Sequence, residues 1–171
     1  MNFGSFIGKL EKMRERLDNV PEVVEWFVHD NKEMLVDLNR DQMLLGRNAE
    51  GEILTPGYLE DPYFKTPEAA QRYAARKAIL ERRHHERITY PLNFPEKDRN
   101  TPNLIIRGDF QDAMFIKPTP DSFTIDSSYK YAGDIDTKYR KKLYGLAPLS
   151  RQYVWDNGLR YKIMNYLFSW L

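Results

Sequence analysis

Two short runs of strand-forming residues limit any β-sheet that this sequence can build. The runs are Met114–Lys117 and Ser122–Asp126, and the triplet TPD at 119–121 between them has the chemistry of a hairpin turn. Just before them, Gly108 suits a turn and Asp109 a helix cap, so that a short helix can follow. The sequence therefore predicts an antiparallel hairpin with one helical turn in front of it.

The N-terminal part of the chain has a helical pattern. Apolar residues recur at three- and four-residue intervals from Phe3 to Leu17, which predicts one helix with a single apolar stripe. Asn19 and Pro21 favour the end of this helix and the start of a second, expected from about Pro21 to Leu45 and ended by a left-handed Gly46. The expected inward face of the second helix consists of Val24, Phe27, Val28, Met34, Leu35 and Leu38.

The most basic element is expected to be a helix from Pro67 to Arg87, capped by Thr66. A cluster of cations on one face is the footprint of phosphate contacts, and the candidates to face DNA are Arg72, Arg76, Arg82, Arg83 and Arg87. The competing interpretation is a solvated helix whose inward stripe is Ala69, Tyr73, Ala74, Ala78 and Leu80. With 26 Lys and Arg against 25 Asp and Glu, the whole chain has no general attraction to DNA.

The last helix is expected to start at Ser150, as its cap, and to run to the end of the chain. Its apolar residues form two stripes on roughly opposite sides, whereas a helix that covers only its own core needs one. One stripe is Tyr153, Val154, Tyr161, Met164, Phe168 and Leu171. The other, with Tyr131 from an earlier segment, is the candidate subunit interface: Trp155, Leu159, Ile163, Tyr166 and Trp170. Alternatively, Gly158 interrupts the helix and re-phases both stripes. The aromatic content of 13% also favours interfaces.

Composition and motifs give little support to an enzyme. There is no cysteine, there are three histidines, and no phosphate-binding loop or nucleophile motif is apparent. A metal-dependent nuclease remains an alternative because several carboxylates cluster in sequence, namely Asp109, Asp112, Asp121, Asp126, Asp134 and Asp136. Most of them occupy expected turns, caps and strand ends. We therefore expect no catalytic residue, no metal and no cofactor, and neither a signal peptide nor a membrane span.

Four segments occur in an order typical of one family. They are Leu38–Tyr58, Leu104–Ile116, Asp121–Asp136 and the closing "YGLAPLSRQYVWDNGLRYKIMNYLFSWL". In the second segment the match rests on Gly108, Phe110 and Ala113, and in the third on Tyr131 and Ala132, while Arg107 stands where the family has a small residue. The order resembles phage virion-morphogenesis or tail-completion proteins, which are head-tail connectors of the neck, in the variant of Bacteroidetes (crAss-like) podoviruses. Segment 59–102 has no counterpart in the family.

The resemblance implies an α+β fold in which N-terminal helices and a long C-terminal helix pack on a small antiparallel sheet with extended loop arms at 47–66 and 88–103. We expect a single domain, 1–171, made of N-terminal helices (1–46), an arm with the basic helix (47–102), and the hairpin with C-terminal helices (103–171).

The function that the resemblance implies is structural. Such proteins form a homo-oligomeric ring of roughly six or twelve copies between portal and tail, and the ring does no covalent chemistry. Its partners would be other neck, portal or tail proteins and, transiently, the genomic DNA. It would lie in the virion, and in the host cytoplasm during assembly. The alternative function is a small DNA-binding accessory protein that uses the basic helix.

Overall fold

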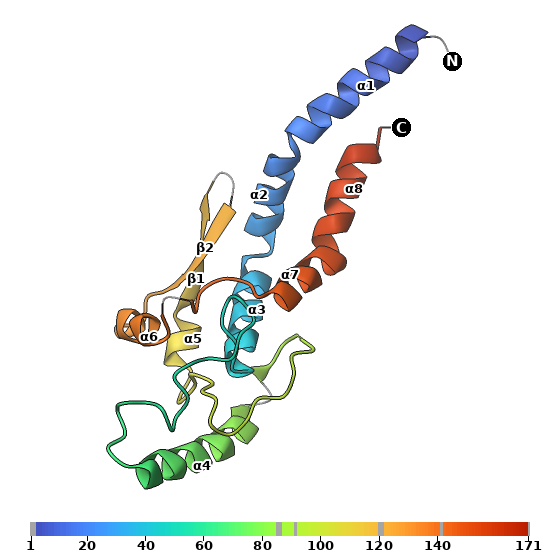
Figure 1. Ribbon diagram of the computed structural model, residues 1–171. Coiled ribbons are helices and arrows are strands. Elements are labelled where there is room, and N and C mark those ends of the chain that lie inside the picture. The colour runs from blue at the N-terminus through green and yellow to red at the C-terminus, as the bar shows by residue number, and fades with distance from the viewer. Residues whose placement is uncertain (1–2, 85–86, 91, 120–121, 141, 171) are drawn as a thin grey trace.

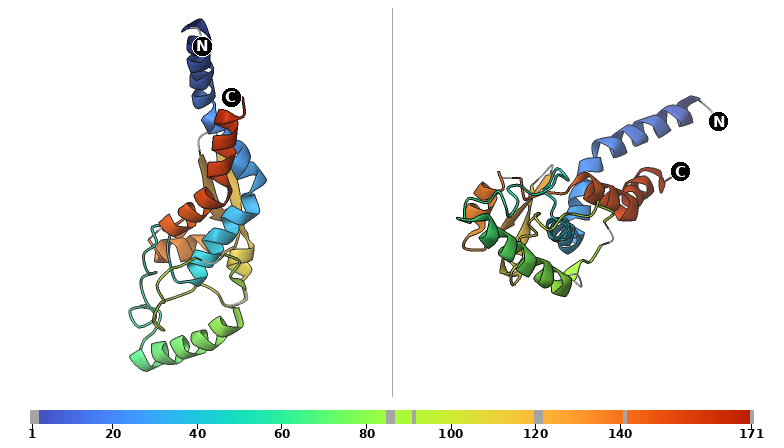
Figure 2. Two further views of the ribbon diagram at one scale, coloured as in Figure 1. Left: turned by 90° about the vertical axis from the view of Figure 1, so that its right-hand side faces the viewer. Right: turned by 60° about the horizontal axis from the view of Figure 1, so that its bottom comes forward.

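The computed structural model describes residues 3–84, 87–90, 92–119, 122–140 and 142–170. The molecule is elongated (Figures 1 and 2). Three N-terminal helices follow one another along its length, α1 (Phe3–Asp18), α2 (Val20–Asp30) and α3 (Lys32–Leu44). The C-terminal α8 (Arg160–Phe168) lies beside α1 and α2 at one end, and α4 (Pro67–His84) lies across the other end.

The first predicted helix is confirmed, but the second is two helices. Asn31 separates α2 from α3 with φ −119° and ψ 26°, and its side-chain Nδ2 donates a hydrogen bond to Phe27 O at 2.8 Å. A short polar side chain that bonds the backbone competes with the helical ladder, which explains the break. Gly46 ends α3 as predicted, with φ 71°, while the N–H of Arg47 donates to Gln42 O.

The hairpin is confirmed. Strands β1 (Met114–Thr119) and β2 (Ser122–Ser127) pair antiparallel, with Ile116 opposite Ile125. Residues 120–121 of the expected turn, including Asp121, lie outside the described part of the chain. Before β1 comes the short α5 (Asp109–Asp112), and Gly108 at its start has φ 109°, as a turn residue should. Asp109 as a cap was wrong, because Gly108 holds the cap position and Asp109 is the first helical residue, with no side-chain cap bond.

Thr66 caps α4 as predicted, since its Oγ1 accepts the N–H of Ala69 at 3.3 Å. The buried face of α4 includes Ala70, Ala74 and Lys77. A further short helix, α6 (Ala132–Lys138), follows the hairpin, and Tyr131 stands immediately before it.

The C-terminal helix is interrupted. Helix α7 (Pro148–Val154) continues into a wide turn, Trp155–Leu159, and then into α8. The break falls at Asn157 and Gly158, so the alternative in which Gly158 re-phases the stripes is the correct one. A Cβ at Gly158 would lie 3.0 Å from the Phe27 ring, which shows how closely the backbone approaches α2 there.

The prediction that Ser150 caps the last helix is wrong. Ala147 occupies the cap position of α7, and Ser150 lies within the helix, fully buried, where its Oγ hydrogen-bonds to Gln42 Oε1 at 3.0 Å. Pro148 at the first position explains the earlier start, because a proline there loses no helical hydrogen bond.

Two clusters of apolar side chains form the core, and residues of the hairpin link them. Ile116 and Phe123 from the two strands and Leu146 before α7 pack against both clusters. The first cluster joins α3 to the hairpin and α6, and consists of Val36, Met43, Leu54, Phe110, Met114, Ile125, Ala132, Tyr139 and Leu143. The second joins α2 and α3 to α7, and consists of Phe27, Val28, Leu35, Leu38, Leu92 and Val154. The α+β fold with helices packed on a small antiparallel sheet is confirmed.

Candidate interaction surfaces

Helix α8 has two different faces. Ile163, Tyr166 and Trp170 are half-buried, and the Arg16 guanidinium of α1 lies 5.0 Å from the Tyr166 ring and 5.9 Å from the Trp170 ring. Leu159 packs against the second core cluster. These four candidate interface residues thus face α1 and α2 of their own chain. The sequence pattern did not show this orientation when an unbroken helix was assumed. The break at Gly158 changes the direction of the chain, so that these residues of α8 face inward.

The opposite face of α8 is exposed and apolar. Tyr161 is 76% exposed, and Met164 and Phe168 are 46% and 43% exposed. Of the candidate interface residues, Trp155 and Tyr131 are also exposed, but neither belongs to α8. The free apolar face of α8 therefore comes from the stripe that was not predicted to be the subunit interface.

Helix α1 exposes its apolar stripe. Phe6, Ile7, Leu10 and Leu17 are between 41% and 53% exposed. The side of α1 that contacts α8 carries Lys12 and Arg16 instead. At ~100° per residue, that side is roughly 130° around the helix from the apolar stripe. The stripe consequently points away from the rest of its own chain.

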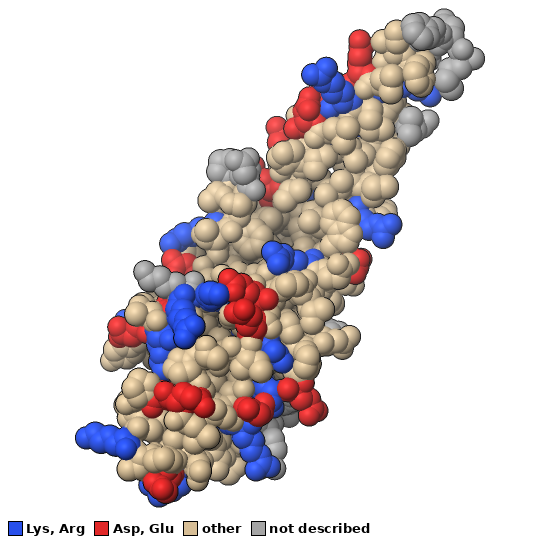
Figure 3. All heavy atoms as spheres, in the orientation of Figure 1, with Lys and Arg blue, Asp and Glu red and all other residues tan. Residues whose placement is uncertain are grey.

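We call α1, α2 and α8 together the stalk. Figure 3 shows the side of the stalk that faces the viewer, where few Lys, Arg, Asp or Glu side chains interrupt a surface of uncharged residues and most charges lie along the edges. Between α2 and α7, at the base of the stalk, lies an apolar groove of about 760 Å³ whose walls include Val24, Phe123, Trp155 and Leu159. The stalk thus combines exposed apolar helices with an apolar hollow.

The basic helix does not present one cationic face. Arg72 and Arg76 are exposed and form no ion pair with the described residues. Lys77 points inward, where its Nζ donates to Ile105 O, and burial lowers the pKa of its ammonium group to about 8. Arg87 pairs with Asp112 at 3.5 Å. The side chains of Arg82 and Arg83 lie outside the described part of the chain.

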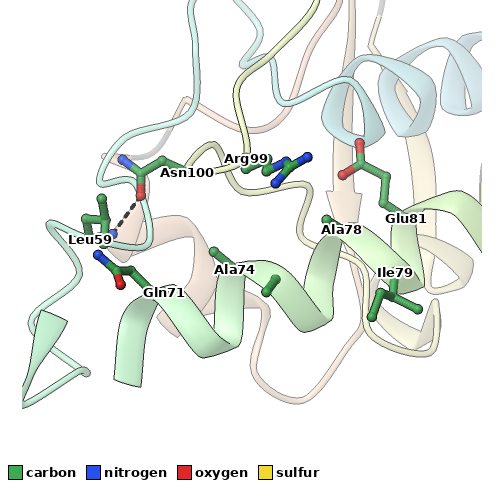
Figure 4. Close-up of a pocket in the computed structure, with 9 residues that line it drawn as sticks. Leu59, Gln71, Ala74, Ala78, Ile79, Glu81, Arg99 and Asn100 are labelled. Atoms are coloured by element: carbon green, nitrogen blue, oxygen red, sulfur yellow. Dashed lines mark hydrogen bonds between the residues drawn. The ribbon is translucent and has the colours of Figure 1, made fainter. Parts of the chain in front are cut away.

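A groove of about 870 Å³ runs along α4 (Figure 4). Its floor is made of small residues, Ala74, Ala75 and Ala78, and the loop residue Leu59 closes one end through a hydrogen bond from its N–H to Asn100 Oδ1 at 2.7 Å. Glu81 on its wall accepts a hydrogen bond from Lys97 Nζ at 2.8 Å. Leu59 and Asn100 lie at one end of this groove and Glu81 at the other (Figure 4).

The candidate metal-binding carboxylates are spread over several elements. Asp126 pairs with Lys117 across the hairpin at 2.9 Å, Asp112 contacts Arg87, and Asp109 and Asp134 lie in the first turns of α5 and α6. Within the described ranges, no three His, Asp or Glu residues lie together in a way that could hold a metal ion.

Asp41 is a buried charge that the sequence did not reveal. It is 1% exposed, and its Oδ2 accepts the N–H groups of Thr89 at 3.0 Å and Tyr90 at 2.8 Å. These bonds fix the start of the 88–103 arm to α3. Burial raises the pKa of the Asp41 carboxyl to about 6, against the lowering effect of the two N–H donors. The sequence did hold one sign of this burial: Asp41 lies three residues after Leu38 and so shares the expected inward face of the second helix.

We expect Asp41→Asn to remove a pH dependence of stability. Since the pKa of about 6 in the folded state exceeds the ordinary aspartate pKa of 3.8, the folded state binds the proton more tightly than the unfolded chain does. Unfolding free energy should therefore fall as the pH rises from about 4 to about 6, by up to ~3 kcal/mol. Urea unfolding at several pH values should show this fall in the wild type and not in Asp41→Asn.

The exposed Asp134 provides the matched control. Asp134→Asn should keep the wild-type dependence on pH. If Asp41→Asn also keeps it, the carboxyl of Asp41 does not titrate as its burial implies.

Comparisons with protein-family models, with curated proteins and with solved structures find nothing that matches this chain. In the described part of the chain, no helix is both long enough and apolar enough to cross a bilayer.

Proposed function

We propose that this chain is a structural subunit of a phage virion neck. In this proposal it is a ring-forming head-tail connector or tail-completion protein that bridges the portal or adaptor to the tail around the DNA channel. It assembles with copies of itself and with other neck, portal or tail proteins. Its place is the virion, and the host cytoplasm during assembly.

The observation that carries the proposal is the exposed apolar surface of the stalk. Apolar side chains on two helices, α1 and α8, point away from the body of their own chain. Monomeric proteins rarely leave contiguous apolar surface of this kind uncovered. A ring subunit needs two different contact surfaces, because its contacts to the two neighbours are not alike. The stripe of α1 and the outer face of α8 meet that need.

The fold adds support, because it matches what the resemblance to neck proteins implies. N-terminal and C-terminal helices pack on a hairpin, Gly108 is followed by the short α5 that precedes it, and Ala132 is buried at the start of α6. The small sheet and short helices hold the stalk at one end of the molecule, where it can reach a neighbour.

A DNA-binding accessory protein is the second candidate function. Arg72 and Arg76 favour it, since both are exposed and cations on one helix can contact phosphates, although Glu68, one turn before Arg72, interacts with the Arg72 charge. The burial of Lys77 removes one cation from that helix. Gel-shift binding that weakens steeply with salt and is lost in an Arg72→Ala and Arg76→Ala variant would support this function.

Electron microscopy of negatively stained protein tests the first proposal. We expect closed rings with a central opening. A field of small compact particles, together with salt-sensitive DNA binding by the same sample, would instead favour the second function.

A further inference from the structure

The outer side of α2 carries an exposed tryptophan bordered by acids. Trp26 is 58% exposed, Glu22 lies one turn before it, and Glu25 lies next to it. Both glutamates are exposed, and neither forms an ion pair with the described residues. An aromatic ring beside free carboxylates is a surface that suits a guanidinium group together with apolar side chains.

The apolar stripe of α1 has the complementary chemistry. Arg14 lies within the stripe, one turn after Leu10 and one turn before Leu17, and Lys9 lies at one edge. Both cations are exposed and form no ion pair with the described residues. Elsewhere on α1 the chain already places a cation on aromatic rings, since Arg16 lies over Tyr166 and Trp170. If the stripe is buried against a partner, the guanidinium of Arg14 loses water and then requires an acid or an aromatic ring opposite it.

The two surfaces cannot meet within one chain. Helices α1 and α2 follow one another end to end, joined at Asn19, so that the stripe of α1 cannot reach the outer side of its own α2 (Figure 1). We propose that α1 of one copy packs on the outer side of α2 of the next copy. Phe6 and Leu10 then cover Trp26, and Arg14 meets Glu22 and Glu25.

Charge disfavours the other occupants of the stripe. The exposed face of α8 offers Arg14 the rings of Tyr161 and Phe168 but no acid, since α8 contains no Asp or Glu, and Arg160 borders that face. Two α1 helices packed in parallel would bring Arg14 beside the same residue of the other copy, and like charges at that spacing are unfavourable. The acidic border of Trp26 is the better match.

This contact joins two different surfaces, so each copy can bind one neighbour through the stripe of α1 and the other neighbour through the outer side of α2. Contacts of this type close into a ring when the rotation between copies allows it. The inference rests on the homo-oligomer part of the proposed function and specifies which surfaces form it. The outer face of α8 is then left for a different partner.

Mixing two broken copies tests the inference. One copy carries Phe6→Glu and Leu10→Glu, which removes the stripe, and the other carries Trp26→Lys, which removes the acceptor and repels Arg14. Alone, each should self-associate at least ~100-fold more weakly than the wild type, because each loses buried apolar area. Mixed one to one, they should form a heterodimer of about twice the 20.3 kDa chain and nothing larger, as measured by light scattering after gel filtration.

The mixture distinguishes the alternatives. If α1 paired with α1, the Trp26→Lys copy, whose stripe is intact, would self-associate alone like the wild type and would form no heterodimer with the first copy, and the inference would be overturned. If the wild type associates and both variants still do so alone, another surface is used, which overturns the inference but leaves the proposed ring. A wild type that is monomeric at every concentration overturns both.

A second pair of variants, with reversed charges, controls for the possibility that the first pair does not fold. Thermal unfolding reports whether the variants fold. The Arg14→Glu copy and the Glu22→Arg and Glu25→Arg copy should each associate weakly alone. Mixed one to one they should assemble to the size of the wild type, because both contacts between unlike copies pair opposite charges. In addition, all three charge reversals placed in one chain should restore self-association to within about tenfold of the wild type, because the ion pairs are then re-formed in the opposite sense. Failure of this restoration in folded protein would overturn the proposed pairing.

Discussion

The triple variant Phe6→Glu, Leu10→Glu and Leu17→Glu is expected to be monomeric under conditions in which the wild type assembles. Burying one large apolar side chain is worth ~1.5–3 kcal/mol, so losing three of them should weaken each contact at least about a thousand-fold. Glutamate keeps α1 helical, since it is a good helix former. The three substituted residues are 47% to 53% exposed, so the folded monomer loses little buried area.

A matched control has the same number of substitutions at the other end of the molecule. Leu59, Tyr63 and Ile79 are 49%, 79% and 48% exposed and lie away from the stalk, near α4. The variant Leu59→Glu, Tyr63→Glu and Ile79→Glu makes the same change in net charge and should assemble like the wild type. Equal loss of assembly in both variants would mean that added charge, and not the α1 stripe, is responsible.

Gln42→Leu should be the most destabilising single substitution that we predict. Gln42 is fully buried, its Nε2 donates to Gly145 O at 2.6 Å, and its Oε1 accepts from Ala147 N at 2.9 Å and Ser150 Oγ at 3.0 Å. Leucine leaves the N–H of Ala147 and the hydroxyl of Ser150 buried without this acceptor. Each such group costs ~1–3 kcal/mol, so we expect a loss of about 2–5 kcal/mol in urea unfolding.

The same substitution at an exposed glutamine is the control. Gln71 lies on the solvent side of α4, and Gln71→Leu should change stability by no more than ~0.5 kcal/mol. A loss below about 1 kcal/mol for Gln42→Leu would contradict the role of Gln42 in joining α3 to the start of α7. That junction sets the direction of α7 and thereby the place of α8 in the stalk.

Local sequence signals predicted the elements whose cause is local. The apolar spacing from Phe3 to Leu17 gave α1, Gly46 gave the left-handed end of α3, and Thr66 gave the cap of α4. The hairpin followed from two runs of strand-forming residues on either side of a turn. Each of these depends on neighbours within a few positions along the chain.

The parts that could not be predicted depend on contacts between distant residues. Ser150 has the chemistry of a cap, but Gln42, which is distant in sequence, binds its hydroxyl inside the core. Lys77 lies on the inner side of α4 because the distant carbonyl of Ile105 accepts a hydrogen bond from its ammonium group. The break at Gly158 was foreseen only as an alternative, and its approach to Phe27 decides which stripe of α8 is free.

The break at Gly158 changes which residues are candidates for the interface. With an unbroken helix, Leu159, Ile163, Tyr166 and Trp170 would face a neighbour. In the structure they support the stalk from inside, and Tyr161, Met164 and Phe168 are the exposed apolar residues of α8. The assignment of an interface to the C-terminal helix stays a prediction, now on its other face.

The central claim is that the stalk assembles copies of this chain into a ring. Light scattering after gel filtration, over a wide range of loading concentrations, measures it most directly. The account predicts one closed species of roughly six or twelve copies that forms cooperatively as concentration rises. A mass equal to the 20.3 kDa chain at every concentration would contradict it.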